Sequence, residues 1–151
     1  VPCFIPVGSR IDCLTISAEL SSEAPGVNEV WPSDISFSVD GVLLGKWTSP
    51  GDFGNQRGRL NPEWWHDSLN QYGFLKMLTV NHEGTFIDGR KLSDVNLDVL
   101  ALDDRRGIRL RFAVVGDSDH VGGMTLFGRS FGNYERDIEV RMDYSQTAEN
   151  N

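Results

Sequence analysis

Apolar and polar residues alternate with a period of two along this chain, and this period constrains the fold more than any other feature. The alternation is clearest in Ile35–Val39, Ile108–Val115 and Ile138–Tyr144, and weaker matches cover Leu14–Leu20 and Phe74–Val80. Successive side chains of a strand point to opposite faces of a sheet, so each stretch would turn one face to a core and the other to water. The chain is therefore predicted to be all-β.

Two dipeptides at the ends of apolar runs predict tight hairpins. Asp40-Gly41 follows Ile35–Val39, and Asp88-Gly89 follows Thr85–Ile87. Asp-Gly supplies the positive φ angles of a type I′ turn, which joins two antiparallel strands. Leu92–Leu102 is ambiguous, because Ser93 could cap a short helix while the Val and Asn content suits a strand equally well.

Many short strands separated by glycine-rich turns indicate two antiparallel sheets packed as a sandwich, jelly-roll-like, with about eight strands. A closed β-barrel is the alternative fold, and the sequence does not distinguish the two. The 151 residues contain no internal repeat and no low-complexity linker. We therefore expect a single domain over residues 1–151, with a frayed polar tail at residues 145–151.

The acidic composition argues against direct DNA binding. Fourteen Lys and Arg residues against 22 Asp and Glu residues give a net charge of −8. A surface that binds a DNA duplex must neutralise phosphates with basic side chains, so any contact with DNA would need another domain. No apolar run approaches the ~18 residues that span a bilayer, so no membrane partner is expected.

The motifs of common enzymes and metal sites are missing from the sequence. It contains no G-x-S-x-G elbow, no H-E-x-x-H helix, no P-loop and no C-x-x-C pair, and its three His residues are widely separated. Carboxylates are plentiful, but no local context marks a catalytic pair. We therefore expect no enzymatic activity, no cofactor and no resident transition metal. Cys3 and Cys13 are expected to be free thiols, because a small secreted scaffold usually carries more cysteines.

The longest irregular segment runs from Trp47 to Tyr72 and contains three of the four tryptophans. Long ordered loops in compact domains are usually functional. Flat indoles beside Asp, Asn and Arg suit a sugar, because a ring face stacks on apolar C–H groups while polar side chains bind hydroxyls. A second polar loop, Asp117–Met124, contributes His120. The predicted ligand-binding residues are Trp47, Asp52, Arg57, Arg59, Trp64, Trp65, His66 and His120.

Each of these residues also has a purely structural interpretation. Trp64 and Trp65 are adjacent, so in an extended segment only one could face a ligand while the other packs inward. Arg57 and Arg59 could instead anchor the loop to some of the many carboxylates of this chain. Asp117–Met124 could be a solvated connector or a loop that binds Ca²⁺.

Four segments of the sequence carry a resemblance to one protein family. They are residues 31–35 (WPSDI), 47–54 (WTSPGDFG), 57–65 (RGRLNPEWW) and 120–128 (HVGGMTLFG). They resemble the C-terminal all-β domain of a family of bacterial transcriptional regulators that carry an N-terminal ArsR-like winged helix–turn–helix. The resemblance covers the chain from about Ile11 to Tyr144. It implies an effector-sensing or oligomerising role in the cytoplasm, with DNA bound by a winged-helix domain that residues 1–151 do not contain.

We therefore expect the effector-sensing or oligomerisation domain of a bacterial transcriptional regulator, which binds a sugar-like or other polar small molecule and forms a homodimer. The alternative is a carbohydrate-binding module of an extracellular protein, which would use the same aromatic chemistry. A dimerising β domain without a small ligand is a third interpretation.

Overall fold

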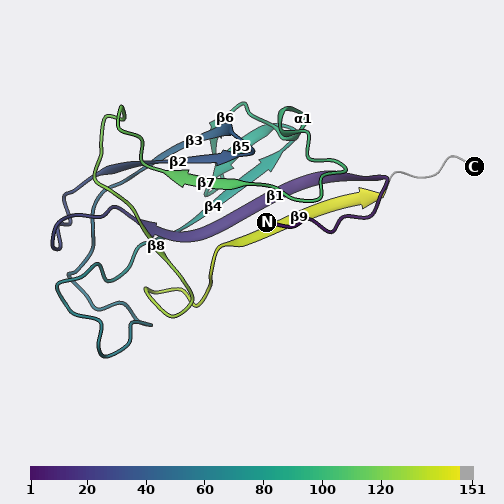
Figure 1. Ribbon diagram of the computed structural model, residues 1–151. Coiled ribbons are helices and arrows are strands. Elements are labelled where there is room, and N and C mark those ends of the chain that lie inside the picture. Colours follow the sequence, from purple (N-terminus) through teal and green to yellow (C-terminus); the bar gives the residue numbers. More distant parts are fainter. Residues whose placement is uncertain (147–151) are drawn as a thin grey trace, which may run out of the picture.

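The computed structural model describes residues 1–146, and it consists of two antiparallel sheets with 43% of residues in strands and 3% in helix. The larger sheet has the order β6-β5-β4-β1-β8, and β9 also pairs with β1 (Figure 1). Its strands are β1 (Ser9–Ser21), β4 (Phe74–Asn81), β5 (Gly84–Ile87), β6 (Arg90–Ser93), β8 (Thr125–Phe127) and β9 (Glu139–Gln146). The smaller sheet has the order β3-β2-β7, from β3 (Val42–Ser49), β2 (Ser33–Val39) and β7 (Leu110–Ala113).

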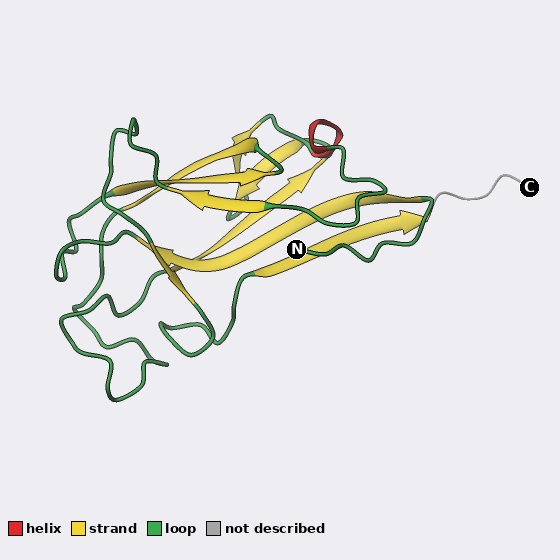
Figure 2. Ribbon diagram, viewed as in Figure 1, coloured by secondary structure: helices red, strands yellow, loops and turns green. Residues whose placement is uncertain are grey.

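The prediction of an all-β, two-sheet antiparallel sandwich is confirmed, and the alternative of a closed barrel is wrong. The larger sheet curls into a half-barrel that does not close. Figure 2 shows the strands in yellow as two layers, with one short helix in red at one end. The core between the layers is made of fully buried side chains from both sheets: Leu14, Ile16, Leu20, Ile35, Phe37, Val39, Leu44, Leu78 and Val80.

Both predicted hairpins are present. β2 and β3 meet at Asp40 (φ 48°) and Gly41 (φ 83°), and β5 and β6 meet at Asp88 (φ 48°) and Gly89 (φ 82°). Positive φ at both central residues is the requirement of a type I′ turn.

The ambiguous segment Leu92–Leu102 contains both kinds of structure. Strand β6 ends at Ser93, and the short helix α1 (Leu97–Leu100) follows it. Its N-cap is Asn96 rather than Ser93, since Asn96 Oδ1 accepts a hydrogen bond from the Val99 amide at 3.0 Å. The part of the chain that the structure describes holds no helix of the length and hydrophobicity that crossing a membrane requires.

Two strands differ in extent from their sequence patterns. β7 is shorter than Ile108–Val115, because the backbone at Ile108 pairs with the N-terminal segment, where its amide donates to the Val1 carbonyl at 2.9 Å. β9 is longer than expected, since Ser145 and Gln146 pair with β1 instead of fraying. The rest of the predicted tail, residues 147–151, lies outside the described residues. The two cysteines are free thiols.

Candidate functional site

Four long loops leave the two sheets at one end of the sandwich, opposite α1 (Figures 1 and 2). They comprise residues 22–32, 50–73, 114–124 and 128–138. The loop of residues 50–73 contains most of the predicted ligand-binding residues. These segments contain no strand of either sheet, and both backbone and side-chain hydrogen bonds hold their conformation.

Asn70 is buried and holds the loop of residues 50–73 against the end of β1. Its Nδ2 donates to Ser21 Oγ at 2.6 Å and to the Ser22 carbonyl at 3.0 Å. Its Oδ1 accepts from the Phe53 amide at 3.3 Å. One side chain therefore ties both ends of the loop to the sheet.

Gln71 is also buried, and it holds the middle of the same loop. Its Nε2 donates to the His66 carbonyl at 2.9 Å, and its Oε1 accepts from Asn61 Nδ2 at 2.9 Å. Asn61 Oδ1 in turn accepts from the Gly132 amide at 2.7 Å. The loops of residues 50–73 and 128–138 are thus joined by a chain of amide hydrogen bonds.

Glu19 on β1 anchors the loop of residues 128–138 to the larger sheet. Its carboxylate is 1% exposed and accepts hydrogen bonds from the backbone amides of Gly73, Asn133 and Tyr134 at 2.9–3.1 Å. A Cβ at Gly132 would lie 2.4 Å from Glu19 Oε1, so glycine is required for this close approach. Burial raises the pKa of the Glu19 carboxyl, and the three amides oppose that rise because they stabilise the charged form.

Trp64, Trp65 and Phe131 form a cluster at the outer end of these loops, which we call the aromatic tip. The ring centroids of Trp64 lie 5.9 Å from those of Trp65 and Phe131, and all three pairs meet edge to face. Trp65 is half-buried and its Nε1 donates to the Asn70 carbonyl at 3.0 Å. Trp64 is 72% exposed. One indole of the adjacent pair therefore supports the loop, and the other faces solvent.

Arg57 and Arg59 differ in their surroundings. Arg57 Nη1 donates to the Trp65 carbonyl and to Asp67 Oδ1, both at 2.9 Å, so this guanidinium is engaged by the loop itself. Arg59 is exposed and fixed at its backbone, where its amide donates to Asn133 Oδ1 at 3.0 Å. Arg57 therefore anchors the loop, as its structural interpretation predicts, and the side chain of Arg59 remains accessible to a ligand.

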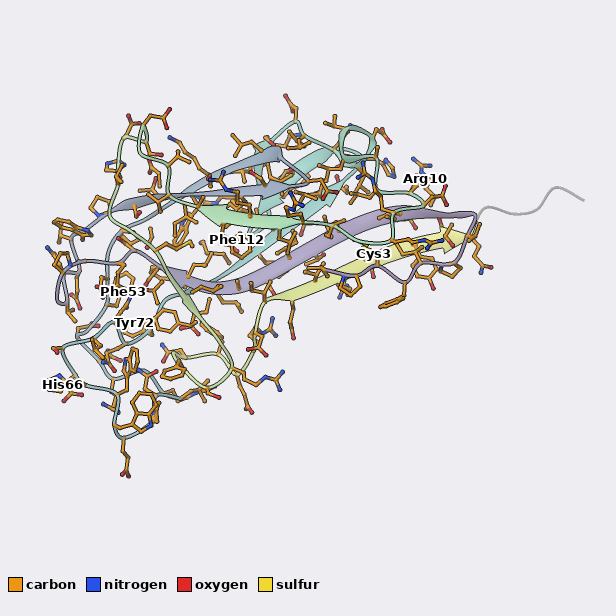
Figure 3. All side chains as sticks on the ribbon, viewed as in Figure 1. Cys3, Arg10, Phe53, His66, Tyr72 and Phe112 are labelled. Atoms are coloured by element: carbon orange, nitrogen blue, oxygen red, sulfur yellow. The ribbon has the colours of Figure 1, made fainter. Side chains whose placement is uncertain are left out.

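His66 is exposed on the same loop, next to the aromatic pair, and is labelled at the loop end of the molecule in Figure 3. Its Nδ1 lies 2.8 Å from Ser68 Oγ. Glu63 and Asp67 beside it are exposed as well. Charged and hydrogen-bonding side chains therefore flank the exposed indole along the chain.

Trp47 belongs to a second aromatic group instead of the aromatic tip. Phe74 meets Trp47 and Phe53 edge to face, at 5.9 and 5.3 Å, and Phe53 stacks on Tyr72 at 5.3 Å. Phe53 and Tyr72 lie near the base of the loops in Figure 3. Lys76 Nζ lies 4.5 Å from the ring centroid of Trp47. The charged group of the lysine therefore already occupies a position against this ring.

Asp52 is fully buried and joins two loops. Its Oδ2 accepts from the Ala24 amide at 3.0 Å, and its Oδ1 has no hydrogen-bond partner in the described residues. Burial raises the pKa of Asp52, the Ala24 amide opposes this, and the neighbouring charge of Glu23 raises it further. In this structure Asp52 is inaccessible, and it positions residues 22–32 rather than facing a ligand.

His120 is held by β2 rather than by the aromatic tip. Its Nδ1 lies 3.2 Å from Asp34 Oδ1, which also accepts from Thr48 Oγ1 at 2.6 Å, and Lys46 Nζ lies 3.5 Å from Asp34 Oδ2. The Thr48 hydroxyl contributes most to lowering the pKa of Asp34 to about 2, against the opposing effect of burial, and His120 and Lys46 lower it further. This cluster fastens residues 114–124 to the smaller sheet.

Six of the eight predicted residues therefore lie on the loop of residues 50–73, but Asp52 is buried and Arg57 binds within the loop. Arg59, Trp64 and His66 are exposed there and Trp65 is half-buried, whereas Trp47 lies on β3 and His120 on another loop. Sequence reasoning missed Phe131, although a large aromatic residue directly before Gly132 (φ 73°) in a glycine-rich loop is a usable signal. It also missed the buried carboxamides and Glu19, which have no local signature.

Four surface cavities of about 170–510 Å³ are lined by none of the eight predicted residues. The largest is lined by Val1, Ile108, Arg109, Leu110, Ile138 and Val140. Within residues 1–146, no three His, Cys, Asp or Glu side chains gather as a metal ion would require. The candidate site is therefore defined by exposed rings and their supporting loop.

Comparisons with protein-family models, with curated proteins and with solved structures found no match. The site is accordingly derived from the residues of this chain alone, and the resemblance to ArsR-like regulators stays a prediction.

Proposed function

We propose that this chain is a ligand-binding domain that stacks a sugar-like ring on the aromatic tip. The observation that carries the proposal is Trp64, which is 72% exposed on a loop fixed by buried polar side chains. A packed Trp removes about 150–250 Å² from water, so an outward indole forgoes stabilisation that binding could recover. Because the supporting loop is already ordered, a ligand would have little backbone entropy to overcome.

The chemistry around Trp64 favours a polar, uncharged ring. An indole face packs on the apolar C–H groups of a pyranose. The exposed side chains of Arg59, Glu63 and His66 lie on the same loop and offer both donors and acceptors to hydroxyl groups. The net charge of −8 disfavours ligands that carry several phosphates.

The proposed biological role is effector sensing in a bacterial transcriptional regulator of the ArsR-like type, in the cytoplasm. The acidic surface supports the assignment of DNA contact to a winged-helix domain outside this chain. A coupling free energy of about 1–3 kcal/mol between the two domains would change DNA affinity about 5–150-fold.

Titration calorimetry with a panel of neutral mono- and disaccharides tests the binding proposal. We expect one or more sugars to bind, and Trp64→Ala to weaken that binding at least about tenfold. Trp31→Phe is the matched control, because it removes an indole from another loop and is expected to leave affinity unchanged. Binding of no sugar by the unaltered chain, or equal binding by Trp64→Ala, would refute the proposal.

A carbohydrate-binding module of an extracellular protein is supported by the same exposed indole. The two roles differ in what binding does. A sensor is expected to change the affinity of the intact regulator for its operator when the sugar is added, whereas a module is expected to retain the chain on an insoluble polysaccharide without affecting any DNA complex.

A further inference from the structure

Strand β9 is the longest open edge of the described sheets. In residues 1–146 it pairs only with β1, although it is eight residues long. The edge strands β6 and β7 have four residues each. The free edge of β3 is covered, since Ser93 Oγ donates to the Leu44 carbonyl at 2.5 Å and the Leu92 side chain packs over Gly45. An open row of backbone donors and acceptors is a template for another strand.

The sequence of β9 has no proline and no lysine, which natural edge strands use to block pairing, although three of its eight residues are charged. Val140 and Met142 are half-buried against the core, while Glu139, Arg141 and Asp143 form the exposed outer face. The strand therefore presents one apolar and one charged row, and its pairing with β1 shifts register opposite Asp143 and Tyr144.

Apolar side chains are also exposed beside the inner face of β9. A cavity of about 170 Å³ is lined by residues of the N-terminal segment and by Val140, Met142 and Tyr144. Phe4 at its rim is 90% exposed, and Tyr144 is 44% exposed. Figure 3 shows the N-terminal segment at Cys3 running next to β9. An added strand would extend the sheet along this apolar strip.

We propose that β9 pairs antiparallel with β9 of a second copy of this chain, about a two-fold axis at Met142. An axis perpendicular to the sheet makes both copies turn their apolar rows to the same side. In this register Arg141 stands opposite the partner subunit's Asp143 at two symmetric places. Val140 stands opposite the partner subunit's Tyr144, so apolar residues face apolar residues.

Charge disfavours the two adjacent registers. An axis at Arg141 would place two arginines opposite each other and would pair Glu139 with the partner's Asp143. An axis at Asp143 would oppose two carboxylates directly. Arg141 already binds Asp143 within one copy, with Nη2 and Oδ2 at 3.1 Å, so the two copies would form an alternating square of four charges. Opposite charges across strands stabilise pairing, and like charges destabilise it.

The test measures oligomeric state by size-exclusion chromatography with light scattering across a concentration series. The unaltered chain is expected to be a dimer. Arg141→Asp leaves only carboxylates at positions 141 and 143, and Asp143→Arg leaves only guanidiniums, so each variant is expected to raise the dimer dissociation constant at least about tenfold. Mixing the two variants restores opposite charges at both places, so the mixture is expected to form a heterodimer.

Arg90→Asp is the control, because it makes the same charge change on β6 at the opposite edge of the same sheet. It is expected to dimerise like the unaltered chain. Circular dichroism of each variant verifies the fold. A monomeric unaltered chain, dimerisation of each charge variant alone, or failure of the folded variants to associate on mixing would overturn the proposal. Each outcome is independent of sugar binding at the aromatic tip.

Discussion

The carboxylate of Glu19 accepts a hydrogen bond from the backbone amide of Asn133 at 3.0 Å, across 114 positions of the chain. Strand β1 therefore reaches with one buried side chain into the loop that carries Phe131. The same carboxylate binds the Gly73 amide at 2.9 Å, at the end of the loop that carries Trp64. A single anionic group thus fixes the bases of both loops that form the aromatic tip.

Replacement of this carboxylate is expected to destabilise the fold. Glu19→Gln puts an NH₂ group against backbone amides that are themselves donors, so at least one buried hydrogen bond is lost. We expect a decrease of about 2 kcal/mol in the free energy of unfolding, measured by urea denaturation at neutral pH. The exposed Glu135→Gln is the control and is expected to change it by less than about 0.5 kcal/mol. Equal stability of the two variants would contradict the anchoring role of Glu19.

Asp34 is expected to make the protein sensitive to acid. Its pKa is lowered from 3.8 to about 2 in the folded protein, chiefly by the Thr48 hydroxyl. A folded-state pKa below the unfolded value means that the stabilisation is complete above about pH 4 and is lost as the pH falls toward 2. Thermal unfolding between about pH 2 and 6 is therefore expected to show a steeper acid decline for the unaltered chain than for Asp34→Asn.

The exposed Asp119→Asn provides the matched control for that profile. It is expected to keep the acid decline of the unaltered chain. An unchanged profile in Asp34→Asn would show that the Thr48 and His120 contacts do not stabilise the charged carboxyl.

Structure set by neighbouring residues could be predicted from the sequence, and structure set by distant contacts could not. The hairpin at Asp40 and Gly41 depends on the φ angles of these two residues, so the Asp-Gly dipeptide is enough to predict it. The pairing of Ile16 with Val140 does not follow from alternation, because the period specifies which side chains share a face and not which strand lies beside them.

The same distinction explains what was missed at the candidate site. Adjacency of Trp64 and Trp65 predicts that one ring points outward but does not say which. The burial of Glu19 depends on loops that arrive from Gly73 and Asn133, and no local pattern in β1 reveals them. The loop position of Asp52 suggests ligand binding, yet its side chain is fully buried and accepts a hydrogen bond from the Ala24 amide.

The turn between β2 and β3 is expected to depend on glycine for its backbone conformation alone. Gly41 has φ 83°, and a Cβ there would meet no atom within 4 Å. Gly41→Ala is therefore expected to cost about 1–2 kcal/mol of unfolding free energy, the penalty of the left-handed region for an L-residue. Gly116→Ala is the control, since that site is equally open and has no positive φ. Similar melting temperatures for the two variants would exclude backbone strain as the cause.

Replacement of the two tryptophans of the aromatic tip is expected to lower the free energy of unfolding by different amounts. Trp64 is 72% exposed, so Trp64→Ala is expected to change the free energy of unfolding by less than about 1 kcal/mol. Trp65 is half-buried and bonds the Asn70 carbonyl, so Trp65→Ala is expected to cost about 3 kcal/mol. Urea denaturation followed by circular dichroism checks both values. A larger loss for Trp64→Ala would mean that this indole supports the fold and is not free for a ligand.

Asp52 is expected to respond to substitution in the opposite sense to Asp34. Burial raises its pKa, so the folded state disfavours the charged form, and this carboxyl lowers stability as the pH rises above 3.8 through the raised value. Asp52→Asn keeps an acceptor for the Ala24 amide and removes the buried charge. We expect the stability of the variant to depend less on pH above about 4 than that of the unaltered chain, measured by thermal unfolding. The same pH dependence in both proteins would show that burial does not raise the pKa of Asp52.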